Sequence, residues 1–162
     1  MSEKNKSIES LIKFLDQVET KNISSTNIFE KLEDLYFLTV GHKLFTILKF
    51  YPSLQELERV YTNNPIQYPI SGRKKVIDSN WTTHLLIKGK VYIGYNHEDI
   101  KRNFPDYQLI RKLGCGSVLN LPLIDDNKVI GSINLLHEEY WYKKSHIKTA
   151  ETYSQFAVKK LV

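Results

Sequence analysis

The feature that most constrains this chain is a change in the spacing of its apolar residues. Within residues 1–40 and 143–162 they recur every three or four positions, as on one face of a helix. Much of residues 41–137 alternates instead between apolar and polar positions. Helices therefore stand at both ends of the chain, with strands between them. This order predicts an α+β fold in which an antiparallel sheet carries helices largely on one face.

Two helices are expected before the first strand. Ser7 has the position of an N-cap for the first helix, whose apolar face would contain Ile8, Leu11, Ile12, Leu15 and Val18. The second helix begins near Asn27 and Glu30, which have the spacing of a capping box, and it ends at Gly41. A C-terminal helix is expected to begin at Ser145.

Four β-rich segments form two pairs. Residues 44–50 stop at Pro52, and residues 57–62 follow after a short turn, which fits two antiparallel strands. Residues 117–124 and 128–137 flank a turn made of acidic and amide residues, a composition typical of a β-hairpin. The sequence therefore predicts two strand pairs that are far apart along the chain.

A mixed segment, roughly from Pro65 to Gly116, separates these two pairs and is called the insertion below. It contains a candidate strand at 90–94 and candidate helices at 81–87, 97–104 and 107–113. Long connections in compact domains usually carry function. We therefore expect the insertion to cover the second face of the sheet and to close a pocket there.

Length and composition fit one globular domain, expected over residues 1–162, with a hydrophobic fraction of 41%. A single cysteine excludes an internal disulfide framework, and no apolar stretch approaches the ~20 residues of a membrane helix. These features predict a cytoplasmic protein without a membrane partner. The net charge of +5 is spread along the chain, so a nucleic-acid partner is not expected.

The second hairpin carries a pattern that is known from one family. Its first strand runs from Gly116-Ser117 through apolar residues to Pro122-Leu123, and its second strand contains a hydrophobic residue followed by Gly131. With the element order, this pattern resembles the end of a GAF domain, a fold related to PAS domains. The resemblance implies that a small molecule lies between the sheet and the insertion. It also implies that terminal helices pair two copies into a homodimer.

Cys115 is the first candidate for chemistry, because a thiol between Gly114 and Gly116 would be accessible. One GAF branch reduces free methionine sulfoxide through cysteine, so the resemblance makes Cys115 the candidate catalytic residue of a small-sulfoxide reductase. That cycle normally needs a resolving cysteine, which this sequence lacks. Bilin-attaching members usually have histidine after their cysteine, where this chain has Gly116. The alternative for Cys115 is a structural residue at a tight turn.

The pocket is expected to combine polar side chains from the hairpin with aromatic rings from the insertion. Two asparagines interrupt apolar strands, and each buried amide needs a hydrogen-bond partner, either a ligand or a loop backbone. The expected ligand-binding residues are Trp81, Tyr95, Phe104, Cys115, Asn120, Asn134 and His137. The alternatives are that the aromatic rings only form a small core under the insertion, and that His137 is a surface residue at the end of its strand.

The leading interpretation is a sensory, small-molecule-binding domain that acts without an attached effector and without catalysis. A thiol-dependent reductase and a protein–protein interaction module without a ligand are the alternatives. The histidines are scattered singly, so no metal site and no cofactor are expected. The run Arg73-Lys74-Lys75 favours a solvated charged loop, with an anion site at the pocket mouth as the alternative.

Overall fold

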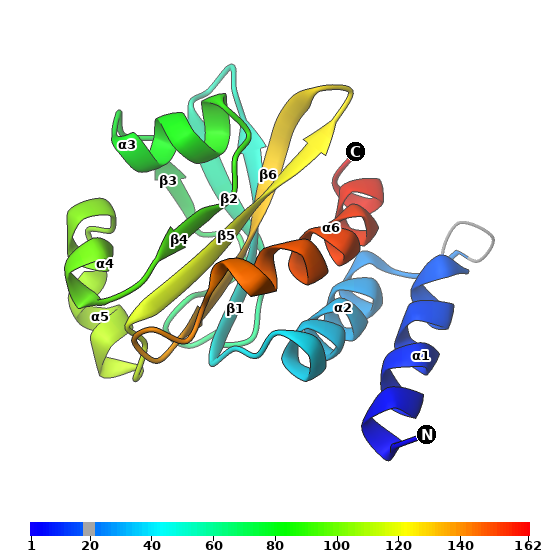
Figure 1. The fold of residues 1–162 in the computed structure, drawn as a ribbon. Helices are drawn as coiled ribbons and strands as arrows, with labels where there is room; N and C mark the ends of the chain where they lie inside the picture. Colours follow the sequence, from blue (N-terminus) through cyan, green and yellow to red (C-terminus); the bar gives the residue numbers. More distant parts are fainter. Residues whose placement is uncertain (18–21) are drawn as a thin grey trace.

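The computed structural model describes residues 1–17 and 22–162, so Val18, expected on the first helix, lies outside the described residues. A six-stranded antiparallel sheet with the strand order β3-β2-β1-β6-β5-β4 forms the centre of the molecule (Figure 1). The two expected strand pairs meet in its middle, where β1 lies beside β6. The strands are β1 (Leu44–Tyr51), β2 (Glu56–Thr62), β3 (Arg73–Lys75), β4 (Tyr92–Gly94), β5 (Ser117–Asp125) and β6 (Lys128–His137).

Helices cover both faces of this sheet, as Figure 1 shows. On one face lie α2 (Ser25–Thr39) and α6 (Ile147–Leu161), with α1 (Glu3–Asp16) packed along the outer side of α2. The insertion covers the other face with α3 (Asn80–Thr82), the π-helical turn η2 (Thr83–Ile87), α4 (His97–Asn103) and α5 (Tyr107–Lys112). The expected α+β architecture, with helices on one face and a mixed insertion over the other, is therefore confirmed. Within the described residues, no helix has the length and apolar character needed to cross a membrane.

The two faces of the sheet differ in polarity, and this difference creates the site. Successive strand residues point to opposite faces. The face toward α2 and α6 is apolar and contains Phe45, Ile47, Leu119, Leu121, Leu123, Ile133 and Leu135. The face toward the insertion buries four polar side chains among leucine and valine, namely Thr46, Asn120, Ser132 and Asn134.

Three helix starts differ from the predicted ones. Ser2 caps α1 by accepting a hydrogen bond from the backbone of Asn5, so Ser7 lies inside the helix. Ser24 caps α2 in the same way. A 3₁₀ turn (Lys144–His146, η3) precedes α6, so Ser145 is not its cap. In each case several polar residues stand near the helix start, and the spacing of apolar residues does not say which one has the extended backbone of a cap.

The basic run Arg73-Lys74-Lys75 forms the edge strand β3 rather than a solvated loop. Its outward residues pair with acidic residues of β2. Arg73 lies 3.0 Å from Glu56 and 2.9 Å from Glu58, and Lys75 lies 3.1 Å from Glu56. An edge strand held by ladder hydrogen bonds and ion pairs needs no apolar alternation, so the sequence pattern does not indicate it. Lys74 projects to the opposite face.

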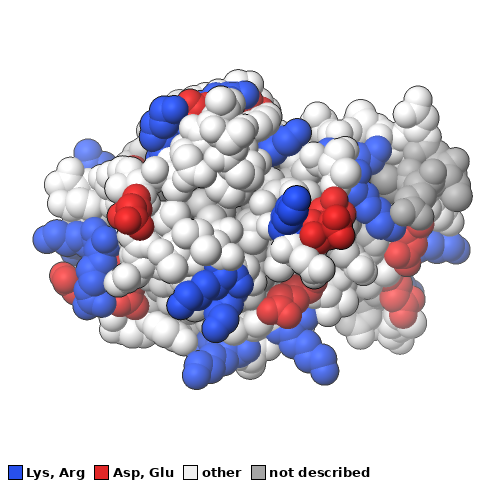
Figure 2. Space-filling view, turned by 90° about the horizontal axis from the view of Figure 1, so that it is seen from above, with Lys and Arg blue, Asp and Glu red and all other residues white. Residues whose placement is uncertain are grey.

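Basic residues are distributed over the surface rather than gathered. On the face shown in Figure 2, lysine and arginine side chains are separated by uncharged surface and interspersed with acidic side chains. This arrangement agrees with the spread of basic residues along the sequence.

One buried histidine makes the stability of the fold depend on pH. His42 is 5% exposed, and burial lowers its pKa from 6.5 to about 4. The unfolded chain takes up this proton below pH 6.5 and the folded chain does not, so stability falls as the pH falls from 6.5 to about 4. The loss is at most about 3 kcal/mol.

Urea unfolding across this pH window measures the effect, with His42→Phe as the comparison. Glu33 lies 3.8 Å from His42, and burial raises its carboxyl pKa, so Glu33 favours the folded state as the pH falls. The variant keeps Glu33, and the difference between the two proteins therefore isolates the histidine. Equal pH slopes in both proteins would contradict the assignment.

Candidate functional site

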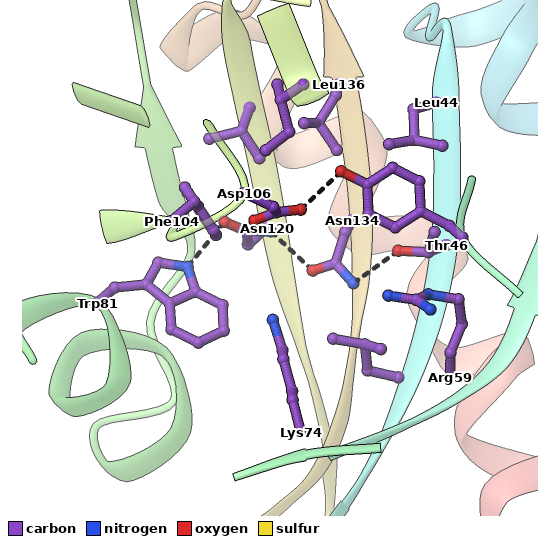
Figure 3. A pocket seen from close by; sticks show the side chains of 14 residues that line it. Leu44, Thr46, Arg59, Lys74, Trp81, Phe104, Asp106, Asn120, Asn134 and Leu136 are labelled. Atoms are coloured by element: carbon purple, nitrogen blue, oxygen red, sulfur yellow. Dashed lines mark hydrogen bonds between the residues drawn. The ribbon is translucent and has the colours of Figure 1, made fainter. Parts of the chain in front are cut away.

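A cavity of about 60 Å³ lies between the sheet and the insertion (Figure 3). Its floor consists of side chains from β1, β5 and β6 on the polar face of the sheet. Its walls come from β2 and from the insertion, including β3. The insertion therefore lies over this face of the sheet and borders a cavity there.

A row of three polar side chains crosses the cavity floor. The strand register places Thr46 of β1 opposite Asn134 of β6, and Asn134 opposite Asn120 of β5. Asn120 Nδ2 donates to Asn134 Oδ1 at 2.7 Å, and Asn134 Nδ2 donates to Thr46 Oγ1 at 3.2 Å. Trp81 of α3 extends the row, because its Nε1 donates to Asn120 Oδ1 at 3.0 Å. Figure 3 shows these bonds as one continuous chain.

The indole of Trp81 fixes the direction of every bond in this row. An indole N–H donates and never accepts, so Asn120 must present its oxygen to Trp81. Asn120 then presents its amide nitrogen to Asn134, whose nitrogen in turn faces Thr46. After these bonds, each amide retains one N–H and the hydroxyl of Thr46 retains its proton. Among the bonds of the described residues, none uses these three donors.

A tyrosine–aspartate pair lies at the end of the cavity near α5. Tyr68 donates its hydroxyl to Asp106 Oδ2 at 2.6 Å, and burial raises the pKa of the Tyr68 phenol. Arg59 of β2 lies over the Tyr68 ring, with its Cζ 4.9 Å from the centroid, and its Nη1 donates to the carbonyl oxygen of Pro69 at 3.0 Å. Its Nε is buried and has no partner among the described residues. Burial lowers the pKa of the Arg59 guanidinium.

Lys74 brings a second positive charge to the cavity. Lys74 is an exposed residue of the edge strand β3, and its side-chain nitrogen points into the cavity (Figure 3). The ammonium nitrogen lies 5.5 Å from the centroid of the Trp81 ring. Burial lowers the pKa of Lys74, while the Asp106 carboxylate acts in the opposite direction. No hydrogen bond or ion pair of this ammonium occurs within the described residues.

Four of the seven predicted ligand-binding residues meet at this cavity: Trp81, Phe104, Asn120 and Asn134. The ring of Phe104 packs edge-on against Trp81, with 5.4 Å between the ring centroids. Both rings also belong to buried apolar clusters. They therefore line the cavity and form part of a small core at the same time.

The other three predicted residues lie outside the cavity lining. Tyr95 precedes α4, where its backbone N–H donates to Asp99. His137 stacks on Trp141 at 3.7 Å between centroids, and its Nδ1 accepts from the backbone of Glu138. Each of these residues has a local structural role in the part of the chain that the structure describes.

Cys115 is fully buried, although its flanking glycines suggested an open thiol. Gly116 packs closely against Glu139 and His97, which closes this side of the turn. Burial raises the pKa of the Cys115 thiol to about 11, so the thiol is protonated at neutral pH. A nucleophilic cysteine requires a thiolate and access, and this geometry supplies neither. It agrees with the structural alternative for Cys115.

Sequence reasoning missed four polar residues of the cavity, Thr46, Arg59, Tyr68 and Asp106, as well as its aliphatic lining. Thr46 carries the same signal as the two asparagines, a polar residue between buried apolar neighbours in a strand. Tyr68 and Asp106 lie in segments between regular elements, where periodicity gives no direction for a side chain. For Lys74, the sequence favours a solvated loop and offers an anion site only as the alternative.

No protein-family model matches this sequence, and no curated protein matches it. Solved structures do resemble it. The phycocyanobilin-bound GAF domain of a cyanobacterial phytochrome superposes with a TM-score of 0.70 at 15% identity, covering 95% of this chain and 93% of that chain. The GAF domain of a two-component sensor histidine kinase from Bacillus halodurans gives a TM-score of 0.67 at 16% identity, covering 83% of this chain and 91% of that chain.

A GAF domain/HD domain protein from Geobacter sulfurreducens gives a TM-score of 0.69 at 11% identity, covering 86% of this chain and 93% of that chain. At such low identities the likeness is one of fold. It agrees with the strand order, the helical layers and the insertion described above. This chain has the fold of a GAF domain.

Proposed function

We propose that this chain is a sensory domain that binds a small molecule in the cavity between the sheet and the insertion. The observation that carries the proposal is the polar row Trp81–Asn120–Asn134–Thr46 on the cavity floor. Buried polar groups are normally hydrogen-bonded, and the row leaves two amide N–H groups and one hydroxyl proton unused beside the cavity. A ligand with acceptor atoms satisfies them.

The comparisons support a sensory role. One of the similar structures belongs to a two-component sensor histidine kinase, and another is a phytochrome GAF domain with a bound bilin. In this chain the cavity lies over the sheet and under the insertion, where the family resemblance led us to expect a ligand. A bilin does not fit the cavity as it stands, because a volume of about 60 Å³ holds far less than a tetrapyrrole.

The proposed signal is a shift between two arrangements of the insertion. The cavity of about 60 Å³ has room for a few water molecules, whereas pockets for drug-sized ligands have about 300–1,000 Å³. In this proposal the present arrangement of the insertion suits a small ligand, and a larger ligand requires the insertion to move outward. A ligand that binds one arrangement of the insertion more tightly increases the population of that arrangement. A partner protein or a second copy of the chain then binds this arrangement differently.

A metabolite screen by thermal shift, combined with native mass spectrometry of the purified protein, tests this function. We expect at least one small molecule to raise the melting temperature and to appear as a mass adduct, because ligands that bind only the folded state stabilise it. The shift should be lost in Trp81→Phe, which removes the indole N–H of the polar row, and retained in Trp141→Phe. The indole N–H of Trp141 donates to Val40 outside the cavity. If no compound produces a shift or an adduct, the chain is not a small-molecule sensor.

A further inference from the structure

We propose that the ligand of this cavity is a small monoanion with acceptor oxygens, a short-chain carboxylate such as propionate, bound between Lys74, Arg59 and the polar row. This inference rests on the proposed function and adds the chemical class of the ligand. It depends on three independent features of the cavity: its unused hydrogen-bonding groups, its charges and its size.

The unused hydrogen-bonding groups on the cavity floor are donors. The indole of Trp81 sets the bond directions, which leaves one N–H on each of Asn120 and Asn134 and the hydroxyl proton of Thr46. Arg59 of β2 also lines the cavity, and its Nε is buried without a partner among the described residues. A ligand that satisfies these donors must supply acceptor atoms.

The charges of the cavity leave one positive charge to be balanced. The lining contains two basic residues, Lys74 and Arg59, and one acidic residue, Asp106. The Asp106 carboxylate already accepts the Tyr68 hydroxyl at 2.6 Å. The neighbours of Lys74 on β3 have carboxylate partners, since Arg73 and Lys75 both pair with Glu56. Lys74 points into the cavity without such a partner in the described part of the chain (Figure 3). One carboxylate brings the sum of charges to zero.

Size and apolar surface limit the rest of the ligand. The volume of about 60 Å³ holds only a few non-hydrogen atoms beside the closed insertion. Leucines surround the polar row on the cavity floor, at positions 44, 48 and 136. They provide contact for a short alkyl group but no further polar partner. A nucleotide or a sugar phosphate exceeds this space and carries more charge than the cavity balances.

Fluorescence of Trp81 provides a direct measurement. The chain contains two tryptophans, so Trp141→Phe leaves the cavity indole as the single reporter. Formate, acetate, propionate and lactate are titrated as sodium salts at constant ionic strength, with sodium chloride as the salt control. Propionamide serves as the neutral analogue of nearly the same shape. We expect saturable fluorescence changes and a raised melting temperature with at least one carboxylate, and none with propionamide or chloride.

Two lysines on one strand provide matched variants. Lys74→Met keeps most of the length of the side chain and removes its charge, and we expect it to weaken carboxylate binding about tenfold or more. Lys75→Met is the control, because Lys75 faces outward and pairs with Glu56 at 3.1 Å. It should leave binding unchanged. Without ligand, Lys74→Met should melt at the same or a higher temperature than the parent, because it removes a charge that burial disfavours.

The outcomes separate this inference from the proposed function. If propionamide binds as tightly as propionate, or Lys74→Met binds carboxylates unchanged, the anion assignment is wrong. If none of the four carboxylates binds while another compound from the metabolite screen does, the assignment is also wrong and the sensory function stands. The assignment is also wrong if Lys74→Met binds carboxylates more weakly and, without ligand, melts at a lower temperature than the parent. That result would show a structural role for the lysine.

Discussion

Gly131→Ala is expected to destabilise the fold by about 4 kcal/mol or more. Gly131 lies on β6, paired on one side with Lys49 of β1 and on the other with Leu123 of β5. A Cβ atom at this position would overlap the carbonyl oxygen of Leu48 and would approach the Leu161 side chain to 3.0 Å. Because strands on both sides hold β6, the backbone cannot move away without breaking ladder hydrogen bonds.

Urea unfolding monitored by circular dichroism measures this loss. Lys128→Ala, at the exposed start of the same strand, is the control and should change the free energy of unfolding by no more than about 0.5 kcal/mol. A Gly131→Ala protein that unfolds at the same urea concentration as the parent would show that β6 does not pack against β1 as described.

Asn134→Leu should reduce the free energy of unfolding by about 3 to 5 kcal/mol. The Oδ1 of Asn134 accepts from Asn120 at 2.7 Å and from the hydroxyl of Ser132 at 3.1 Å. Replacement by leucine leaves both donors buried without a partner, and each stranded group costs about 1–3 kcal/mol. The loss of the bond to Thr46 adds to this.

The double variant Asn120→Leu/Asn134→Leu tests whether the row acts as a unit. Removal of both amides also removes the stranded donor of Asn120, so the combined loss should be smaller than the sum of the two single losses. Ser132→Ala, which breaks one bond of the row, should cost about 1 kcal/mol. Strictly additive losses would mean that the hydrogen bonds of the row do not depend on one another.

Much of the fold could be predicted because apolar spacing reports directly on which side of an element is buried. The pairs β1–β2 and β5–β6 follow from alternation and turn composition, and both form where expected. Asn120 and Asn134 could be placed in the site for the same reason, since an amide within an apolar strand must find a partner. The edge strand β3 escaped prediction because ion pairs and ladder bonds hold it, and its sequence carries no apolar signal.

Arg59 shows a different limit of sequence reasoning. Alternation alone places Arg59 on the same face as Tyr61, which packs against the helical layer. The register shifts between Ile47 and Leu48, however, so that Tyr61 pairs with Ile47 but Arg59 pairs with Leu48. Val60 is the extra residue of this bulge, and it turns Arg59 toward the insertion. A single bulge therefore moves a cation into the cavity, and nothing in the spacing of the sequence marks its position.

The two outermost strands of the sheet have a consequence for assembly. β3 and β4 are each only three residues long, and β3 carries a basic side chain at every position. Two copies that met edge to edge along β3 would bring like charges together while gaining few backbone hydrogen bonds. A continuous sheet across two molecules is therefore disfavoured at this border. A twofold assembly would therefore use the β4 edge or the helical surfaces rather than the basic strand.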